Sequence, residues 1–202
     1  MSVPIIGILG GIGSGKSSVI RHVTEFQLQI IDADKVGHDL LQDTDILKQL
    51  SEIFPASVFD TTGQVIRSGL ADRVFGDSPG HRAALAQLQL IVHPGIQAEI
   101  KSQIRSVAPD VDAIVLDAAI LLESGWADEC DHLVYIHTPE STRIQRVTST
   151  RSWTVEQFQR RELVQLPVYI KKQRADFIID NSGTIDEAAQ QMTGILRVLI
   201  NS

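Results

Sequence analysis

A glycine-rich stretch near the start of the chain, GGIGSGKS at residues 10–17, satisfies the pattern G-x-x-x-x-G-K-[ST]. Glycines in such a loop allow consecutive backbone N–H groups to turn inward around phosphate oxygens. The lysine of this pattern reaches the β- and γ-phosphates, and the hydroxyl after it ligates Mg²⁺. We therefore expect a nucleoside triphosphate site formed by Gly11, Ile12, Gly13, Ser14, Gly15, Lys16, Ser17 and Ser18.

Two aspartates follow the next apolar segment, in the order Asp32-Ala33-Asp34. Loops after the carboxyl ends of parallel strands line one crevice, so these side chains are expected beside the phosphate loop. Two residues at i and i+2 on an extended segment point the same way. Either carboxylate could take the proton of an attacking hydroxyl or bind the metal. The alternative is that both only cap the following helix.

A third aspartate, Asp117, ends the apolar run IVLD. In nucleotide enzymes an aspartate in this position supports Mg²⁺ directly or through water, which predicts that Ser17 and Asp117 are the metal residues. The chain has no N-K-x-D segment, which argues against specificity for GTP.

The elements that must position these residues alternate between strand-like and helix-like patterns. Apolar runs at 4–9, 28–32, 113–117, 132–137 and 176–180 predict buried strands. Helices are expected over 17–26, over much of 35–106 and after Thr138, Thr154 and Thr184, which have the residue types of helix caps. Pro94 should end or kink a long helix near His93. The alternation predicts an α/β fold with a parallel sheet covered on both faces.

Composition excludes several classes of protein. Of the 202 residues, 43% are hydrophobic and 21% are charged, which is typical of a globular protein. The net charge of −7 argues against binding nucleic acid, and no apolar run is long enough for a membrane span. Cys130 is the only cysteine, so no internal disulfide is possible and a cytoplasmic location is expected.

The charge is unevenly distributed along the chain. Residues 143–174 contain eight basic side chains, opposed only by Glu156 and Glu162. Charge counting gives about +6 for this stretch and about −13 for the remainder. Such a stretch can be a pair of solvated helix faces or a lid that closes on a polyanion. The phosphate loop favours the lid.

Several segments, taken in order, resemble the dephospho-coenzyme A kinase family. They are IGILGGIGSGKSSV at 6–19, IIDADKVGHDLL at 30–41, RVFGD at 73–77, LQLIVHPGI at 88–96, LDAAILLESG at 116–125, RRELVQLP at 160–167 and RADFIIDNSG at 174–183. The resemblance implies transfer of the γ-phosphate of ATP to the ribose 3′-hydroxyl of dephospho-CoA, with Mg²⁺. It also implies a P-loop nucleoside-kinase-like three-layer α/β fold with a five-stranded parallel sheet, a helical acceptor-side insertion and a lid.

The resemblance also implies roles for individual residues. Asp34 matches the family's base, with Asp32 beside it, and Asn181 matches a residue near the base of ATP. Arg146 matches a lid arginine on the transferred phosphate, and Arg143, one turn earlier, is a second candidate.

The HP dipeptide places His93 near the acceptor, although a histidine here can equally pack at a kinked helix. Asp32, Asp34, His93 and Asp117 are thus the expected acceptor-side residues.

We expect three parts: a nucleotide-binding core of residues 1–34, 107–138 and 175–202, an acceptor-binding helical domain of residues 35–106, and a basic lid of residues 139–174. The expected partners are ATP and dephospho-CoA, without nucleic acid, membrane or an obligate protein partner. Two alternatives stay open: a kinase acting on another small nucleotide or nucleoside, and a regulatory nucleoside triphosphatase that controls a partner protein.

Overall fold

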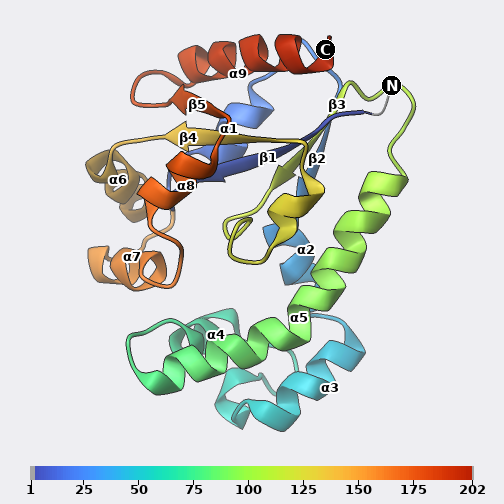
Figure 1. Cartoon of the computed structure of the whole chain (residues 1–202). Coiled ribbons are helices and arrows are strands. Elements are labelled where there is room, and N and C mark those ends of the chain that lie inside the picture. The colour runs from blue at the N-terminus through green and yellow to red at the C-terminus, as the bar shows by residue number, and fades with distance from the viewer. Residues whose placement is uncertain (1–2, 202) are drawn as a thin grey trace. The chain divides into compact units, whose positions relative to one another are not determined.

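The computed structural model of the protein describes residues 3–201, in which five parallel strands form one sheet with the order β2-β3-β1-β4-β5 (Figure 1). The strands are β1 (Ile5–Gly10), β2 (Leu28–Asp32), β3 (Ala113–Asp117), β4 (His132–His137) and β5 (Phe177–Asp180). Each begins and ends within about one residue of a segment that the apolar pattern predicts as a strand. The predicted α/β fold with a five-stranded parallel sheet is confirmed.

The chain divides into two compact units, a core unit of Met1–Asp32 with Gln103–Ser202 and a helical unit of Ala33–Ser102. The core unit contains the sheet and α1 (Lys16–Arg21), η2 (Trp126–Glu129), α6 (Glu140–Thr150), α7 (Val155–Glu162), α8 (Val168–Arg174) and α9 (Ile185–Ile200). The helical unit contains α2 (Ala33–Leu40), α3 (Thr44–Ile53), η1 (Ala56–Val58), α4 (Arg67–Val74) and most of α5 (Pro79–Arg105). Residues 139–174, the segment expected as a lid, belong to the core unit by this division.

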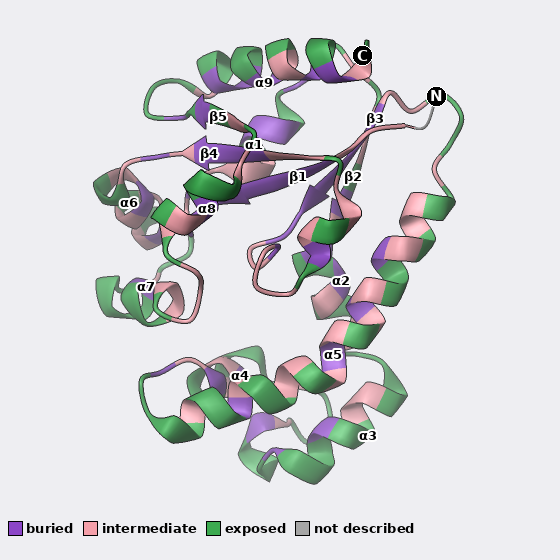
Figure 2. Cartoon of the chain, viewed as in Figure 1, coloured by how far each residue is buried: buried purple, intermediate pink, exposed green. Residues whose placement is uncertain are grey.

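The central strands of the sheet are buried along nearly their whole length (Figure 2). All residues of β3 and all but the first of β1 are buried. This is why both strands read as continuous apolar runs rather than as an alternating pattern. One hydrophobic cluster joins the sheet to α1 and α9 through Val19, Ile20, Met192 and Leu196. In Figure 1, α9 lies above the sheet and α8, which contacts β1 and β4, lies below it.

An aspartate stands directly before each of three strands and pairs with the start of the neighbouring strand. Asp131 accepts a hydrogen bond from the backbone N–H of Ile5 at 2.8 Å and donates its own N–H to the carbonyl of Ile5, also at 2.8 Å. Asp112 and Asp176 make the same reciprocal pairs with Gln27 and Leu133. The carboxylate satisfies a strand-end N–H that the ladder leaves unpaired, so these aspartates help to set the register.

The helix expected over residues 17–26 is shorter, because α1 ends at Arg21. The β-branched pair Val23-Thr24 has low helix propensity, and the chain must turn there to enter β2. Val23 and Phe26 nevertheless pack in the core cluster. The apolar spacing therefore reports burial of the connecting segment rather than one face of a helix.

Pro94 does not end a helix, because α5 runs through it from Pro79 to Arg105. A proline inside a helix removes one backbone hydrogen bond and costs about 3 kcal/mol. Burial of Val92, Ile96 and Ile100 on both sides of Pro94 offsets this cost. Figure 1 shows that the axis of α5 changes direction along its length, as expected for a kinked helix.

Two of the three predicted caps are confirmed. Thr154 and Thr184 form capping boxes at the starts of α7 and α9. The prediction for Thr138 was wrong: Pro139 is the N-cap of α6, and the Thr138 hydroxyl donates instead to the carbonyl of Ser14 at 2.9 Å. The Thr138 hydroxyl thus bonds to a residue far away in the sequence instead of to the first turn of α6.

The helical unit has a hydrophobic cluster of its own, formed by Leu50, Phe54, Val58, Leu70, Val74 and Ala84.

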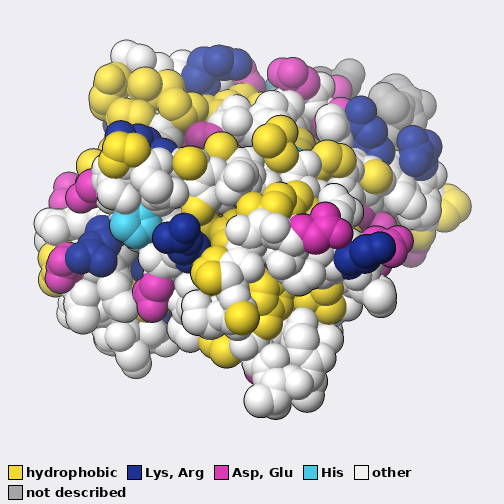
Figure 3. Space-filling view, turned by 90° about the horizontal axis from the view of Figure 1, so that it is seen from below, with side chains coloured by type: hydrophobic (Ala, Val, Ile, Leu, Met, Phe, Trp, Pro, Cys, Tyr) yellow, Lys and Arg dark blue, Asp and Glu magenta, His cyan; other side chains and the backbone are white. Residues whose placement is uncertain are grey.

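On the surface seen from below in Figure 3, hydrophobic side chains occur in separate patches among charges of both signs. Among residues 3–201, no helix is long and apolar enough to cross a membrane.

Candidate functional site

The glycine-rich loop connects the end of β1 at Gly10 to the start of α1 at Lys16. Its backbone takes left-handed conformations at Gly13 (φ 76°) and Gly15 (φ 85°), which a residue with a Cβ adopts only at a cost. A tight turn closes within it, where the N–H of Ser14 donates to the carbonyl of Gly11 at 3.1 Å. The loop has the conformation that the phosphate-binding pattern predicts.

Neighbouring segments approach the loop so closely that its glycines have no room for side chains. A Cβ on Gly11 would lie 2.6 Å from Nη1 of Arg143, and one on Gly13 would lie 2.7 Å from the carbonyl oxygen of that arginine. A Cβ on Gly15 would lie 2.8 Å from Nδ2 of Asn181. Helix α6 and the residue after β5 therefore form the walls of the loop.

The carbonyl oxygen of Ser14 is the point on which these walls converge. It accepts hydrogen bonds from Oγ1 of Thr138 at 2.9 Å, Nη1 of Arg146 at 3.2 Å and Nδ2 of Asn181 at 2.8 Å. Three donors on one carbonyl hold the loop in place and turn that oxygen away from the space where phosphate oxygens, which are also acceptors, would bind.

Two polar atoms at this position lack partners. Oγ of Ser14 and Oδ1 of Asn181 are buried without a hydrogen bond to any described residue. The side chain of Asn181 is fully buried and that of Ser14 is 1% exposed. Buried polar atoms are usually hydrogen-bonded, so these two oxygens indicate a place where a ligand or an ordered water binds.

The two residues predicted to bind the metal are adjacent. Oγ of Ser17 donates to Oδ2 of Asp117 at 2.5 Å, and Asp117 is 5% exposed at the end of β3. Asp32 is the register partner of Asp117 on the neighbouring strand β2. The structure thus brings Ser17, Asp117 and Asp32 together at the carboxyl edge of the sheet.

These oxygens are of the type that Mg²⁺ prefers. Among residues 3–201 there is no cluster of three histidine, cysteine, aspartate or glutamate side chains that could hold a metal by itself.

The two candidate arginines have different surroundings. Arg143 is 4% exposed, pairs with the carboxylate of Glu162, donates to the carbonyl of Ile12 at 3.2 Å and lies 5.3 Å from the ring centre of Phe158. Arg146 is half-buried and donates to the carbonyls of Ser14 and Asn181 at 3.2 and 3.4 Å. Arg143 forms an ion pair and a backbone hydrogen bond within the protein, whereas Arg146 makes long hydrogen bonds to uncharged carbonyl oxygens.

Asp34 and His93 belong to the helical unit. The expectation that Asp32 and Asp34 share an extended segment was wrong, because α2 begins at Ala33, directly after β2. The alternation of side chains along a strand therefore does not relate the two carboxylates. Asp34 lies in the first turn of α2, and His93 lies within α5, where burial lowers its pKa.

Sequence reasoning did not single out Lys171. Only 2% of this side chain is exposed, and its ammonium forms an ion pair with Glu123 at 2.9 Å. Burial lowers the pKa of Lys171, Glu123 acts in the opposite direction, and the charge of Lys16 lowers it further. In the sequence Lys171 looks like any other cation of the basic stretch, so no local signal could have identified it.

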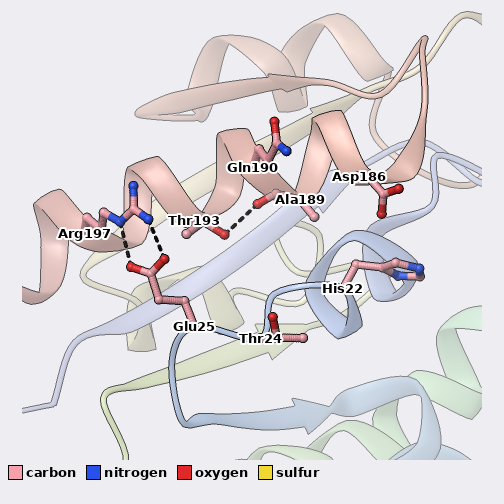
Figure 4. Close-up of a pocket in the computed structure, with 8 residues that line it drawn as sticks. All are labelled: His22, Thr24, Glu25, Asp186, Ala189, Gln190, Thr193 and Arg197. Carbon is pink, nitrogen blue, oxygen red and sulfur yellow. Dashed lines mark hydrogen bonds and ion pairs between the residues drawn. The ribbon is translucent and has the colours of Figure 1, made fainter.

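Two cavities of the core unit are lined by described residues alone. One, of about 540 Å³, is bordered by α6, α7 and α8 and lined in part by Arg143, Glu162 and Val168, which also contact the phosphate loop or its neighbours. The other, of about 650 Å³, lies between the end of α1 and α9 (Figure 4). His22, the C-cap of α1, lines this second cavity, so it is at the opposite end of α1 from Lys16.

Figure 4 shows that the second cavity is closed along one side by the ion pair of Glu25 and Arg197. The hydroxyl of Thr193 is directed back to the carbonyl of Ala189 at 2.8 Å. Among the side chains drawn there, those of Glu25, Arg197 and Thr193 are thus paired within the protein.

Comparisons with known proteins extend over almost the whole chain. The family model described as dephospho-CoA kinase matches residues 4–187. The dephospho-CoA kinase of Corynebacterium diphtheriae is 35% identical over 184 residues, which cover 90% of this chain and 90% of that protein. The dephospho-CoA kinase of Carboxydothermus hydrogenoformans is 32% identical over 197 residues, covering 96% of this chain and 94% of that protein. The crystal structure of a Thermus thermophilus protein matches with a TM-score of 0.80 at 26% identity, covering 98% of this chain and 99% of that one.

Proposed function

This chain belongs to the dephospho-CoA kinase family, and we propose that it transfers the γ-phosphate of ATP to the ribose 3′-hydroxyl of dephospho-CoA, giving CoA and ADP. The observation that supports the chemistry best is the hydrogen bond of Ser17 to Asp117 directly behind the phosphate loop. Ser17 belongs to the loop that would hold the phosphates, and Asp117 is the carboxylate beside it. A metal-bound triphosphate requires both side chains.

In this proposal the triphosphate lies on residues 11–18. The backbone N–H groups of the loop and the ammonium of Lys16 neutralise the β- and γ-phosphate oxygens. Asn181 lies against the loop through its bond to Ser14, and its unpartnered Oδ1 is an acceptor that suits the amino group of an adenine. These contacts favour ATP as the donor.

The residues present fit a Mg²⁺ ion. Ser17 and Asp117 would hold it, with Asp32 next to Asp117 on the neighbouring strand. When bound, the ion would neutralise charge on the β- and γ-phosphate oxygens. Ser17 and Asp117 also restrain each other before any ligand arrives, because the hydroxyl of Ser17 already donates to Asp117.

The proton of the attacking hydroxyl needs an acceptor, and we assign it to Asp34, with Asp32 as the alternative. Asp34 follows β2 by two residues and lies in the first turn of α2. Asp34 therefore follows the carboxyl end of a strand, where a carboxylate can take the proton of an attacking hydroxyl. Asp32, by contrast, sits on the strand beside Asp117, which suits metal support.

Arg146 is assigned to the charge that develops on the transferred phosphate. Its guanidinium already contacts the loop, and its weak bonds to two carbonyls can be exchanged for stronger ones to phosphate oxygens. We propose small molecules as the partners of the protein, with His93 and Asp117 on the acceptor side. We also propose a cytoplasmic location.

The experiment that tests this function measures ADP release with Mg·ATP and one acceptor at a time: dephospho-CoA, adenosine, AMP or shikimate. We expect turnover only with dephospho-CoA, and mass spectrometry should show one added phosphate at the 3′ position. Turnover with another acceptor would assign a different kinase activity. ADP release that does not depend on any acceptor would instead indicate a nucleoside triphosphatase.

Two variants separate the carboxylates in the same assay. Asp34→Asn should lower kcat by about 10²-fold or more while ATP binding changes little, because a general base contributes about that factor. If Asp32→Asn loses kcat and Asp34→Asn does not, the base is Asp32.

Lys16→Ala should abolish transfer in the same assay.

A further inference from the structure

A buried lysine on α8 is fully satisfied by three acceptors. Nζ of Lys171 donates to the carbonyl of Ala119 at 3.0 Å, to Oε1 of Gln165 at 3.0 Å and to Oε1 of Glu123 at 2.9 Å. An ammonium has three donors, and each has a partner here. Burying a charge without such partners costs several kcal/mol, so this arrangement depends on all of them together.

The carboxylate of Glu123 is bound within the same group. Its Oε1 also accepts the backbone N–H of Leu166 at 2.8 Å, which fixes the segment before α8. The side chain of Glu123 is 14% exposed, and its Oε2 has no partner among the described residues. Glu123 therefore anchors both the start of α8 and, through Lys171, the middle of that helix.

This group of side chains connects two parts of the nucleotide site. Ala119 is the second residue after Asp117, which accepts the hydroxyl of Ser17. At the other end, Cγ1 of Val168, the first residue of α8, lies 3.1 Å from where a Cβ of Gly11 would be. Helix α8 therefore touches the phosphate loop and holds the backbone that leaves Asp117.

We propose that Lys171 is a positioning residue that orients Asp117 toward Ser17 by holding the carbonyl of Ala119. The inference rests on the proposed function, in which Ser17 and Asp117 support a metal-bound triphosphate. Lys171 does not touch the nucleotide in this role. Groups behind a metal ligand typically change metal affinity 10–100-fold (order of magnitude) when they are removed.

A purely stabilising role predicts something different. Buried ion pairs can often be replaced by apolar residues of similar size without loss of stability. If Lys171 and Glu123 only filled space, a neutral pair of the same shape would leave metal binding unchanged. If Lys171 orients Asp117, metal binding weakens even when the fold is intact, because the donor to Ala119 is lost.

The test measures binding of Mn²⁺ by electron paramagnetic resonance in the presence of a non-hydrolysable ATP analogue and without an acceptor. The variants are Lys171→Met and the double variant Glu123→Gln with Lys171→Met, which leaves no unpaired buried charge. Lys172→Met, the exposed neighbour on the same helix, is the matched control. Thermal unfolding is measured for each variant.

We expect Mn²⁺ to bind about 10-fold or more weakly to Lys171→Met and to the double variant, and within about 2-fold of wild type to Lys172→Met. Affinity for the analogue in EDTA should stay within about 2-fold. A folded Lys171→Met that binds Mn²⁺ like wild type would overturn the proposal. If that variant does not fold, the double variant decides, and normal Mn²⁺ binding or a second failure to fold would reject the positioning role.

Because no acceptor is present, this result does not depend on dephospho-CoA. A wild-type protein that binds the Mn²⁺ complex but phosphorylates no dephospho-CoA would refute the proposed function while leaving the role of Lys171 intact.

Discussion

Arg143 and Arg146 lie one turn apart on α6, and we predict that their removal has opposite consequences. Arg143→Met should lower the stability of the protein with a small effect on kcat. Arg146→Met should lower kcat with a small effect on stability. The reason is that Arg143 is 4% exposed and paired, whereas Arg146 is half-buried and, among residues 3–201, donates to two backbone carbonyls.

The magnitudes follow from these contacts. Removing one partner of a buried ion pair costs about 3–5 kcal/mol. The remaining partner, Glu162, is 26% exposed and can be hydrated, which places Arg143→Met near the lower limit of about 3 kcal/mol. For a protein of this size that corresponds to a fall in Tm of about 6–12 °C. The two long bonds of Arg146 predict a loss of only about 1 kcal/mol.

For catalysis the order is reversed. An arginine that stabilises charge on a transferring phosphoryl group contributes about 10³-fold or more to kcat. We therefore expect Arg146→Met to lose about that factor, and Arg143→Met to lose less than about 10-fold when it is assayed well below its Tm.

The assay combines thermal unfolding with the ADP-release measurement at saturating ATP and dephospho-CoA. Arg151→Met is a suitable control, because Arg151 is exposed on the same stretch and stacks only on Trp153, at 5.2 Å from the ring centre. The reasoning is refuted if Arg143→Met keeps its Tm and loses kcat as severely as Arg146→Met. It is also refuted if both variants turn over normally.

Three further predictions use other parts of the molecule. Burial raises the pKa of the Cys130 thiol to about 12. A disulfide reagent at pH 8 should therefore label Cys130 about 10²-fold or more slowly than it labels free cysteine. Rapid labelling of the folded protein would contradict this. Burial lowers the pKa of His93, so the unfolded state binds more protons than the folded state below about pH 6.5. The free energy of unfolding should therefore fall as the pH drops from there to the folded-state pKa of His93. Urea titrations should show that His93→Gln flattens this pH dependence. Two guanidinium groups lie near the ring centre of Trp153, that of Arg161 at 4.2 Å and that of Arg151 at 5.2 Å, whereas Trp126 is 2% exposed. Any change of tryptophan fluorescence on adding Mg·ATP should therefore vanish in Trp153→Phe, and its persistence there would place the change at Trp126.

Much of the architecture follows from local patterns that the chain cannot satisfy in another way. The runs that become β1 and β3 are continuously apolar, and such a run can be buried on both sides only within a parallel sheet with helices on both faces. The phosphate loop is equally local, since Gly13 and Gly15 adopt conformations that other residues avoid. The sequence therefore determined the sheet, the loop and the family.

A local pattern predicted wrongly where a long-range contact competes with it. The Thr138 hydroxyl bonds to the carbonyl of Ser14 instead of capping α6. At Pro94 the sequence left two outcomes open, an end or a kink, and α5 continues through the proline with buried residues on both sides. The local preference against such a proline is about 3 kcal/mol, which tertiary packing can offset.

Only the tertiary structure showed which partners the members of the basic stretch have. The resemblance singled out Arg146 and Arg143 but not Lys171, and no local pattern predicted their contacts. Arg143 is bonded to the phosphate loop and Glu162, Arg146 to Ser14 and Asn181, and Lys171 to Glu123 and the backbone after β3. Charge is a property of composition, but burial and partners depend on other segments, and the side-chain hydrogen-bond partners of Arg143 and Arg146 lie between 19 and 132 residues away in the chain. For that reason the sequence could predict that a phosphate site exists, and only the folded arrangement could show which cation each partner holds; the roles that we propose for Arg146 and Lys171 rest on those contacts.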